Sequence, residues 1–451
     1  MRYFHVTSVW AGRLAMIAVA VGLCVGLAAC GGVDHQQLDE WKRTEHGPEK
    51  LADALANEDL SADLRAHAAA NLVAIDKLDE VMDALKNVPE SARGPLMAPL
   101  VDRLWDEAQI KARLDRPTML QVRAKDGLFS LRALAPEKVR ATIDGHLVDW
   151  LAGFFEGRSE AGRFGGEVII RAIGPSAGEK LVAAADEIIA APEENGRRRR
   201  LGDELLRGLA YSGSSSAVAL LLKLTSVKDR DPALGERAMA ALYQAYVEPV
   251  GTEPADPAAL AKNLDALVAV SRRSDVAGQV VNDAVTLIAA SGMPGCLEPL
   301  VAMVSYLHRD PAYRWMGVQQ GIRCGKGAAI VPILEALPET EGYSRGLLDK
   351  YAWDEVIAAA PAPAVVASAK KLVTSKSAVA RISGAELLVK VAQKTGKRGE
   401  VDAAVAKLAG DKAVLRGWHG KGPGADPTVG EVATKLKSEL QEVEKTPGKE
   451  R

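Results

Sequence analysis

Histidines are the first residues to examine for metal or acid–base chemistry, because imidazole binds transition metals and titrates near neutral pH. Six of them follow the first thirty residues of the 451-residue chain: His35, His46, His67, His146, His308 and His419. No pair has the spacing of a helical zinc motif, and no cysteines are spaced for a structural zinc site. We therefore predict no metal and no cofactor, and we interpret His67 as a surface or inter-repeat residue.

Motifs for nucleophilic or phosphoryl-transfer chemistry do not occur in the chain. There is no G-x-S-x-G elbow and no glycine-rich loop that ends in Lys-Ser or Lys-Thr. The tripeptide His308-Arg309-Asp310 matches a kinase catalytic loop in letters only, because the partner motifs are missing. The sequence therefore favours a protein that is not an enzyme and has no catalytic residues.

Two segments carry side chains that often bind partners. A run of arginines could bind anionic headgroups, although its acidic neighbours make a solvated helix start the alternative. Trp418 lies in a glycine-rich stretch, where exposure would suggest an interface and burial would suggest packing between repeats. The candidate partner contacts are therefore Trp418, Arg197, Arg198, Arg199 and Arg200.

The cysteines fit an exported protein. Cys24 and Cys30 fall in the N-terminal apolar region, which leaves Cys296 and Cys324, 28 residues apart. An even remainder in an oxidising compartment favours a bridge, and two small buried thiols are the alternative. A Cys296–Cys324 disulfide is a candidate.

The first thirty residues have the pattern of an export signal. Arg2 and Arg13 accompany an apolar stretch, Leu14 to Leu27, that is shorter than the about 20 residues of a membrane-spanning helix. The sequence Leu27-Ala28-Ala29-Cys30 follows and resembles the lipobox of bacterial lipoproteins. The resemblance implies a signal peptide over residues 1–29 and a membrane anchor of acyl chains, palmitate among them, on Cys30. An ordinary secretory signal and an uncleaved anchor are the alternatives.

The resemblance also implies a location in the cell envelope. Gly31 follows the cysteine, where Asp favours inner-membrane retention in enteric bacteria. The periplasmic side of the outer membrane is therefore the favoured location, and the cell surface and the inner membrane are alternatives.

Composition excludes several classes of protein. The 57 basic and 59 acidic side chains nearly cancel, 48% of the residues are hydrophobic and 4% are aromatic. These values exclude a disordered acidic tail, a collagen-like fibre and a strongly basic nucleic-acid binder. No nucleic-acid partner is expected.

From about Pro48 onward, the chain has the pattern of successive helices. Ser61 is a candidate N-cap for a helix in which Leu64, Ala68, Leu72 and Ile75 recur at helical spacing. The pairs Asp231-Pro232, Asp310-Pro311 and Asp426-Pro427 are further candidate starts, with proline at the first helical position. Runs of alternating β-branched residues are absent. We therefore predict an all-α protein.

Turn-forming glycines recur along the chain with a period. Gly174, Gly213, Gly251, Gly292 and Gly325 are spaced by 39, 38, 41 and 33 residues, and an apolar helix follows each. These units resemble HEAT-type repeats. The resemblance implies an α-solenoid of stacked antiparallel helix pairs, an armadillo-like superhelix in which each pair buries its apolar face on its neighbours.

The predicted domain organisation follows from the residues over which the repeat period can be recognised. After the signal peptide, residues 30–47 form a lipidated N-terminus and short tether, and residues 48–160 form an irregular helical part, where Pro95, Pro99 and Pro117 interrupt the period. Residues 161–410 form HEAT-like repeats, and residues 411–451 form a loop, a terminal helix over Val429 to Val443 and a tail. Two separate helical domains that meet near residues 191–200 are the alternative.

We expect a membrane-anchored envelope lipoprotein that acts as a binding scaffold, with another envelope protein along its concave face. The alternative is a helical-repeat enzyme or enzyme subunit. Phycobilin-lyase-related proteins and alkylpurine DNA glycosylases build pockets in similar architectures, but export argues against a glycosylase, and the chain lacks a recognisable pocket motif.

Overall fold

The computed structural model describes residues 32–110, 116–191, 200–226, 231, 233–250, 253–305, 311–338, 353–396, 398–418 and 426–445. Over these residues the regular elements are helices, and the only β-type pairing is an isolated bridge between Val414 and Thr428. The predicted all-α class is confirmed for this part of the chain.

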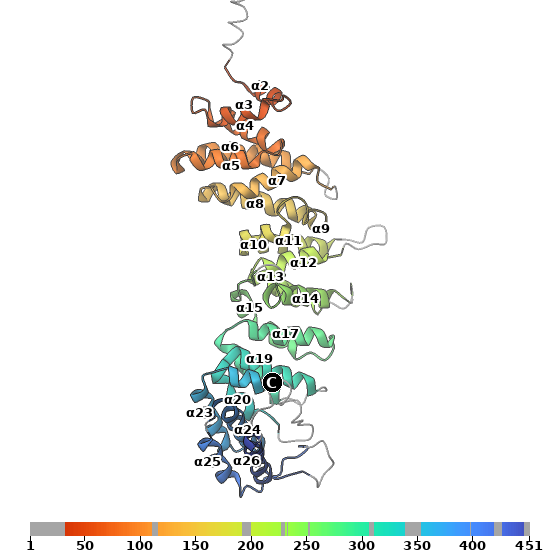
Figure 1. Cartoon of the computed structure of the whole chain (residues 1–451). Helices are drawn as coiled ribbons and strands as arrows, with labels where there is room; N and C mark the ends of the chain where they lie inside the picture. Colours follow the sequence, from red (N-terminus) through yellow and green to blue (C-terminus); the bar gives the residue numbers. More distant parts are fainter. Residues whose placement is uncertain are drawn as a thin grey trace, which may run out of the picture. The chain divides into compact units, whose positions relative to one another are not determined.

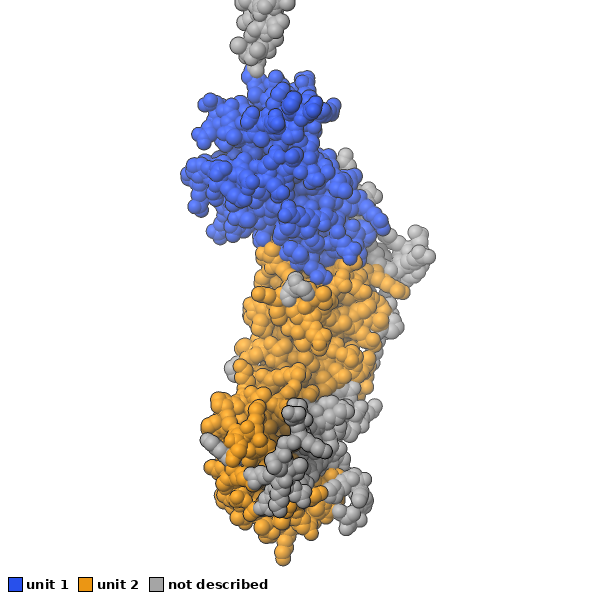
Figure 2. Space-filling view, viewed as in Figure 1, with its two compact units in different colours: residues 1–169 blue, residues 170–451 orange. Residues whose placement is uncertain are grey.

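The chain forms two compact units, residues 1–169 and 170–451 (Figure 2). The boundary falls within a helix and precedes the segment 191–200. The described helices of unit 1 are α2 (His35–Trp41), α3 (Gly47–Ala56), α4 (Ala62–Ala74), α5 (Leu78–Asn87), α6 (Glu90–Ala108), α7 (Met119–Leu131), α8 (Glu137–Gly153), α9 (Phe155–Arg158) and the start of α10 (Gly166–Ile173).

Unit 2 continues with helices of similar length. They are α11 (Pro175–Ala190), α12 (Asp203–Tyr211), α13 (Ser215–Leu224), α14 (Leu234–Tyr246), α15 (Ala258–Ala261), α16 (Leu264–Ser271), α17 (Gly278–Ala290), η2 (Pro294–Cys296), α18 (Leu297–Ser305), α19 (Pro311–Gly325), η3 (Lys326–Ala329), α20 (Ile330–Glu335), α22 (Trp353–Ala358), α23 (Ala362–Val373), α24 (Ala378–Thr395), α25 (Gly399–Leu408) and α26 (Val429–Lys445).

Within each unit, helices pack on helices that are close to them in the chain (Figure 1). In unit 1, α4 lies against α3 and α6, and α6 lies against α7. In unit 2, α17 lies against α14, α16 and α19, and α24 lies against α23 and α26. Each helix therefore buries its apolar side on near neighbours in the sequence.

Local sequence signals fix several helix starts. The Ser61 hydroxyl accepts a hydrogen bond from the backbone N of Leu64 at 3.3 Å, and α4 begins at the next residue, as predicted. Before α26 the cap differs from the prediction. Thr428 Oγ1 accepts from the backbone N of Glu431 at 3.2 Å, and the Glu431 carboxylate accepts from the backbone N of Thr428 at 2.7 Å. This capping box starts the helix in place of Asp426-Pro427.

The other two aspartate–proline pairs differ in outcome. Pro311 is the first residue of α19, as expected. Helix α14, by contrast, begins only at Leu234. Asp231 instead accepts a hydrogen bond from the backbone N of Ala233 at 3.1 Å, which forms a turn before the helix.

Three of the periodic glycines are required by their backbone conformation. Gly174, Gly213 and Gly292 have φ angles of +81°, +64° and +61°, and a Cβ at any of these positions would meet nothing within 4 Å. Only the left-handed backbone therefore restricts these turns to glycine. Gly325 instead ends α19 with a φ angle of −97°.

Helix α6 contains two of the prolines that interrupt the repeat period in the sequence. It continues through both Pro95 and Pro99, although each proline leaves a carbonyl one turn earlier without its donor. Its buried residues include Met97, Leu100 and Leu104, which lie at helical spacing. Burial of this face offsets the lost hydrogen bonds.

Candidate functional site

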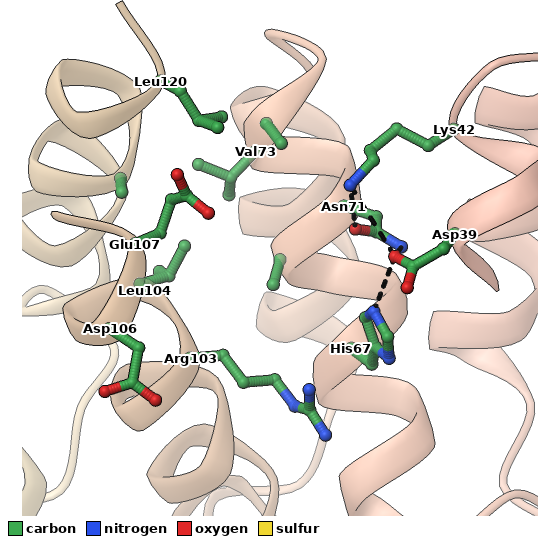
Figure 3. Close-up of a pocket in the computed structure, with 13 residues that line it drawn as sticks. Asp39, Lys42, His67, Asn71, Val73, Arg103, Leu104, Asp106, Glu107 and Leu120 are labelled. Carbon is green, nitrogen blue, oxygen red and sulfur yellow. Dashed lines mark hydrogen bonds and ion pairs between the residues drawn. The ribbon is translucent and has the colours of Figure 1, made fainter. Parts of the chain in front are cut away.

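A cavity of about 530 Å³ opens in unit 1 between α2, α4, α6 and α7 (Figure 3). This volume falls in the range of small-molecule and side-chain binding pockets. Charged and polar side chains form its walls, and small apolar side chains lie between them. The lining residues are Asp39, Lys42, His67, Ala70, Asn71, Val73, Ala74, Arg103, Leu104, Asp106, Glu107, Leu120 and Ala124.

Asn71 joins α4 to α2 on one wall of the cavity. Its Nδ2 donates to the carbonyl oxygen of Leu38 at 3.0 Å and to Asp39 Oδ1 at 3.1 Å. Its Oδ1 accepts from Lys42 Nζ at 3.2 Å (Figure 3). The side chain is buried, so each lost bond would cost about 1–3 kcal/mol. Asn71 therefore positions Asp39 of α2 and Lys42, the residue after α2, in the cavity wall.

Two histidines meet where α2 crosses α4. Nδ1 of His35 lies 2.7 Å from Nδ1 of His67. The ring centres are 5.0 Å apart. Because this separation is large for two nitrogens that lie 2.7 Å apart, the rings meet at their edges, with the two Nδ1 atoms facing each other. At the opposite ring edges, His67 Nε2 lies 3.0 Å from Asp39 Oδ1, and His35 Nε2 lies 3.1 Å from Asp63 Oδ2. Two hydrogen bonds and one ion-pair contact therefore connect the four side chains in a row.

Hydrogen bonds from arginine and asparagine side chains keep the carboxylates of Asp63 and Asp39 ionised. Arg103 Nη2 donates to Asp63 Oδ1 at 2.8 Å, and this bond is the main reason that the pKa of Asp63 lies below its usual value. Burial alone would raise the pKa of Asp39, but hydrogen bonds from Asn71 and His67 outweigh it and lower the pKa. Burial also lowers the pKa of His67, against the opposing effect of Asp39.

The opposite wall carries unpaired negative charge. Asp106 and Glu107 lie exposed on the last turn of α6, and neither has a hydrogen bond or ion pair within the described part of the chain. The C-terminal end of a helix adds a partial negative charge at the same place. Leu104 and Leu120 lie beside them (Figure 3). This wall suits a group that combines a cation with an apolar part.

The cations of the cavity already have partners. Lys42 Nζ lies 3.6 Å from Asp39 Oδ1 besides its bond to Asn71, and Arg103 is paired with Asp63. At the rim, Leu120 is 37% exposed and its neighbour Met119 is 68% exposed. The charge still available to a ligand is therefore negative, next to exposed apolar surface.

A second buried cluster in unit 1 has no open space of this kind. Lys125 is fully buried, and its Nζ donates to Asp126 Oδ1 at 2.6 Å and to the carbonyl oxygens of Ala161 and Phe164 at 2.7 and 2.6 Å. Asp126 in turn accepts from the backbone N of Arg163 at 2.8 Å. Burial lowers the pKa of Lys125. All three ammonium protons have acceptors, so this lysine fixes the loop before α10 to α7.

The residues predicted from the sequence lie elsewhere. Cys30, Arg197, Arg198 and Arg199 fall outside the described residues, as do His308 and His419, whereas Arg200 is described and exposed. Trp418 corrects an expectation, because it is 2% exposed and packs in the core of unit 2 with Leu415 and Val429. Its indole is therefore not presented to a partner in this structure.

Two further tryptophans are buried inside their units. Trp150 and Trp353 are buried, and Trp150 Nε1 donates to the carbonyl oxygen of Ala108 at 3.1 Å. Trp105 stacks on His146 with ring centres 4.3 Å apart. The side chain of Trp315 lies outside the description.

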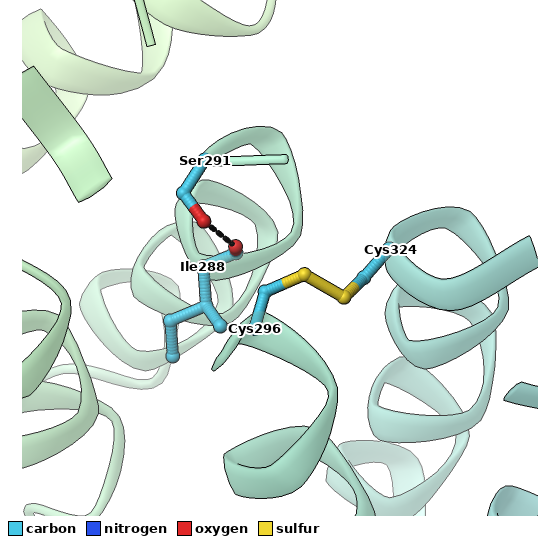
Figure 4. The surroundings of a disulfide bond; sticks show 4 residues. All are labelled: Ile288, Ser291, Cys296 and Cys324. Carbon is cyan, nitrogen blue, oxygen red and sulfur yellow. Dashed lines mark hydrogen bonds between the residues drawn. A yellow bond between two sulfur atoms is a disulfide. The ribbon is translucent and has the colours of Figure 1, made fainter. Parts of the chain in front are cut away.

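The two remaining cysteines form a disulfide in the structure (Figure 4). Cys296 ends η2 and is 1% exposed, and Cys324 lies in the last turn of α19. Their Cα atoms are 6.2 Å apart. The bond therefore joins the entry of α18 to the end of the helix that packs on it.

The chain was compared with family models and with curated proteins. No family model matches the chain, and no match is found among curated proteins. None of the described helices is long and apolar enough to cross a membrane. In the same residues, no group of three or more histidine, cysteine, aspartate or glutamate side chains is placed to hold a metal ion.

Sequence reasoning missed the histidine pair, although a signal for it was present. His35 and Asp39 are four residues apart, and so are Asp63 and His67. Each His/Asp pair therefore lies on one face of its own helix. Pairing them across α2 and α4 required the three-dimensional packing of two helices that are not adjacent in the sequence.

Proposed function

We propose that this protein is a lipid-anchored cell-envelope lipoprotein that acts as a non-enzymatic binding scaffold, with the cavity of unit 1 as its contact site. The lipobox-like Leu27-Ala28-Ala29-Cys30 supports the anchor. Helices that pack on chain neighbours support a HEAT-like array of antiparallel pairs. In such an array, binding arises from shape and many modest contacts.

The partner is a segment of another envelope protein that carries a lysine or arginine next to an apolar side chain. The observation that carries this proposal is the carboxylate pair Asp106 and Glu107, which lies beside Leu104 and Leu120 in the cavity and has no ion-pair partner among the described residues. Removal of a charged pair from water is favourable only when the partner charge is well placed. A basic side chain that enters the cavity meets two carboxylates, while its apolar neighbour covers Leu120 and Met119.

Site-specific photo-crosslinking in intact cells tests the contact. A benzophenone amino acid at Leu120 should capture a discrete partner, whereas the same probe at Val168, which is 46% exposed in α10, should not. The Asp106→Asn/Glu107→Gln double variant should lose the adduct. Glu49→Gln removes an exposed acid on α3 and should retain it. Equal capture from both probe positions would contradict the proposed site.

Cell fractionation tests the anchor separately. The Cys30→Ser variant cannot carry an acyl group on that residue, so the protein should leave the membrane fraction. The Cys296→Ser/Cys324→Ser variant retains Cys30 and should remain there. Unchanged fractionation of Cys30→Ser would rule out lipid anchoring through this residue.

A further inference from the structure

We propose that His35 and His67 share one proton. The hydrogen bond that this proton forms between the two rings, called the latch below, holds α2 against α4 and makes the cavity wall sensitive to pH. The inference uses the proposed function only for what the cavity binds. The pair itself is defined by its contacts, and its titration requires no ligand.

Counting hydrogens in the network gives the charge of the pair. His67 Nε2 is hydrogen-bonded to the Asp39 carboxylate, and His35 Nε2 lies 3.1 Å from an oxygen of the Asp63 carboxylate. A ring nitrogen without a hydrogen would place its lone pair against a carboxylate oxygen at either position, so we assign a hydrogen to both Nε2 atoms. The two Nδ1 atoms, 2.7 Å apart, can form a hydrogen bond only when one of them is a donor and the other an acceptor. The two rings therefore hold three hydrogens and one positive charge.

Either change in proton count breaks the contact. A second proton would place two N–H groups against each other at 2.7 Å, and loss of the shared proton would oppose two lone pairs. In the unfolded chain each histidine titrates independently near pH about 6.5. The folded pair thus keeps one proton over a range in which the unfolded pair goes from two to none.

Stability from the latch therefore has a maximum. Below pH about 6.5 the unfolded chain binds more protons than the folded pair, so stability falls as pH falls. Above it the folded pair binds more, so stability falls as pH rises. The maximum lies where both states bind one proton. Burial of His67, which disfavours its charged form, agrees with His67 as the acceptor ring.

Charged groups on the neighbouring helices also affect how many protons the histidine pair binds. Asp39 and Lys42 face the pair from α2, Asp63 from α4 and Arg103 from α6. Helix α3 packs on α2 through Lys50, which lies 5.7 Å over the Trp41 ring, and sends no charged group to the pair among the described residues. Both carboxylates have a second partner, so they stay ionised while the histidines titrate.

Opening of the latch would change the cavity directly. Helix α2 supplies Asp39 and Lys42 to the wall, and His67 lines it from α4. Acidification puts a second charge on the pair and pushes these helices apart. Helix α2, the first helix of the described residues, would then loosen, and a ligand would lose one wall of its site.

Nitrogen-15 NMR of histidine-labelled full-length protein, with chelator present, measures the proton count. Near pH 6.5, the ordinary histidine value, the spectrum should show both Nε2 atoms of the pair protonated and one proton shared between the two Nδ1 atoms. Two independent titrations of His35 and His67 would overturn the proposal.

A double-mutant cycle with His35→Gln and His67→Gln measures the coupling. The two substitutions should be coupled by about tenfold or more in the unfolding equilibrium constant near pH 6.5, and the coupling should fall on both sides. His46→Gln should show no coupling with His67→Gln. Coupling independent of pH would refute a shared proton.

Hydrogen exchange of peptides that cover residues 38–42 gives a readout that does not depend on the variants. After correction for the intrinsic rate, α2 in the wild-type chain should exchange about tenfold faster at pH about 5 than at pH about 6.5, while α8 stays unchanged. A failed crosslink at Leu120 with intact latch behaviour would reject only the proposed partner. The converse result would reject only the latch.

Discussion

At the residue scale, unit 1 shows how the same types of charged side chain serve two purposes. Lys125 has three acceptors and no space around it, whereas Lys42 faces a cavity with only part of its capacity used. The difference lies in burial and in the number of partners. Full burial makes Lys125 part of the fold, whereas the partly exposed Lys42 helps to form the wall of the cavity through its contacts with Asn71 and Asp39.

Replacing Lys125 by methionine should destabilise unit 1 strongly. The variant leaves the Asp126 carboxylate, 8% exposed, without its cation and leaves two loop carbonyls without a donor. Loss of one partner of a buried pair costs about 3–5 kcal/mol. Urea unfolding followed by circular dichroism measures this loss.

Lys77→Met is the matched control for this substitution. Lys77 and Glu80 form an ion pair of 2.8 Å, similar in length to the Lys125–Asp126 contact, but both side chains are exposed. Its loss should leave the free energy of unfolding unchanged within error. Equal effects of the two substitutions would show that burial is not what makes Lys125 important.

Residue-scale predictions from the sequence succeeded only where the determining interaction is local. Ser61 caps α4 because its acceptor and donor are three residues apart. The burial of Trp418 and the meeting of His35 with His67 depend on helices that come together in space. Sequence spacing within one helix contains no information about such contacts.

At the scale of elements, the disulfide is the one covalent link between helices in the described structure. It joins Cys296 before α18 to Cys324 in α19, across a separation of 28 residues. Closing a loop of this length in the unfolded chain gives about 3–4 kcal/mol of stability in the chain-entropy account. The Cys296→Ser/Cys324→Ser variant should lose about this amount in urea unfolding.

Reductant provides the control for the disulfide prediction. It should destabilise the wild-type chain and have no effect on the double serine variant. Thiol labelling of the unreduced, unfolded protein should find neither Cys296 nor Cys324. Two labelled thiols there would show that the bond does not form in the cell.

The helix boundaries show why the sequence predicts the presence of a helix better than the residues at which it begins and ends. Pro95 and Pro99 interrupt the repeat period in the sequence, but they do not end a helix, because burial of Met97, Leu100 and Leu104 keeps α6 continuous. Asp426-Pro427 has the residue types of a helix start, yet the Thr428–Glu431 capping box satisfies more of the orphan groups and sets the start instead. Where local sequence signals compete, side-chain packing and the hydrogen bonds of the capping residues determine where a helix begins and whether it continues.

At the scale of the whole molecule, packing on chain neighbours makes stability local. A helix that buries its apolar side on the elements before and after it transmits strain mainly to those elements. The two compact units each have their own buried residues, such as Leu100 and Leu128 in unit 1 and Ile333 and Leu372 in unit 2. A single unfolding free energy therefore describes this chain poorly.

Destabilisation should consequently stay within the unit in which it is introduced. Lys125→Met should speed hydrogen exchange in peptides from α7 to α9 and leave α18 to α20 unchanged. Reduction of the Cys296–Cys324 bond should have the reverse effect, because it removes a constraint within unit 2. Exchange measured peptide by peptide distinguishes local opening from global unfolding. If either change accelerated exchange equally throughout both units, the chain would unfold as one cooperative body, and the array of locally packed helix pairs would be the wrong description.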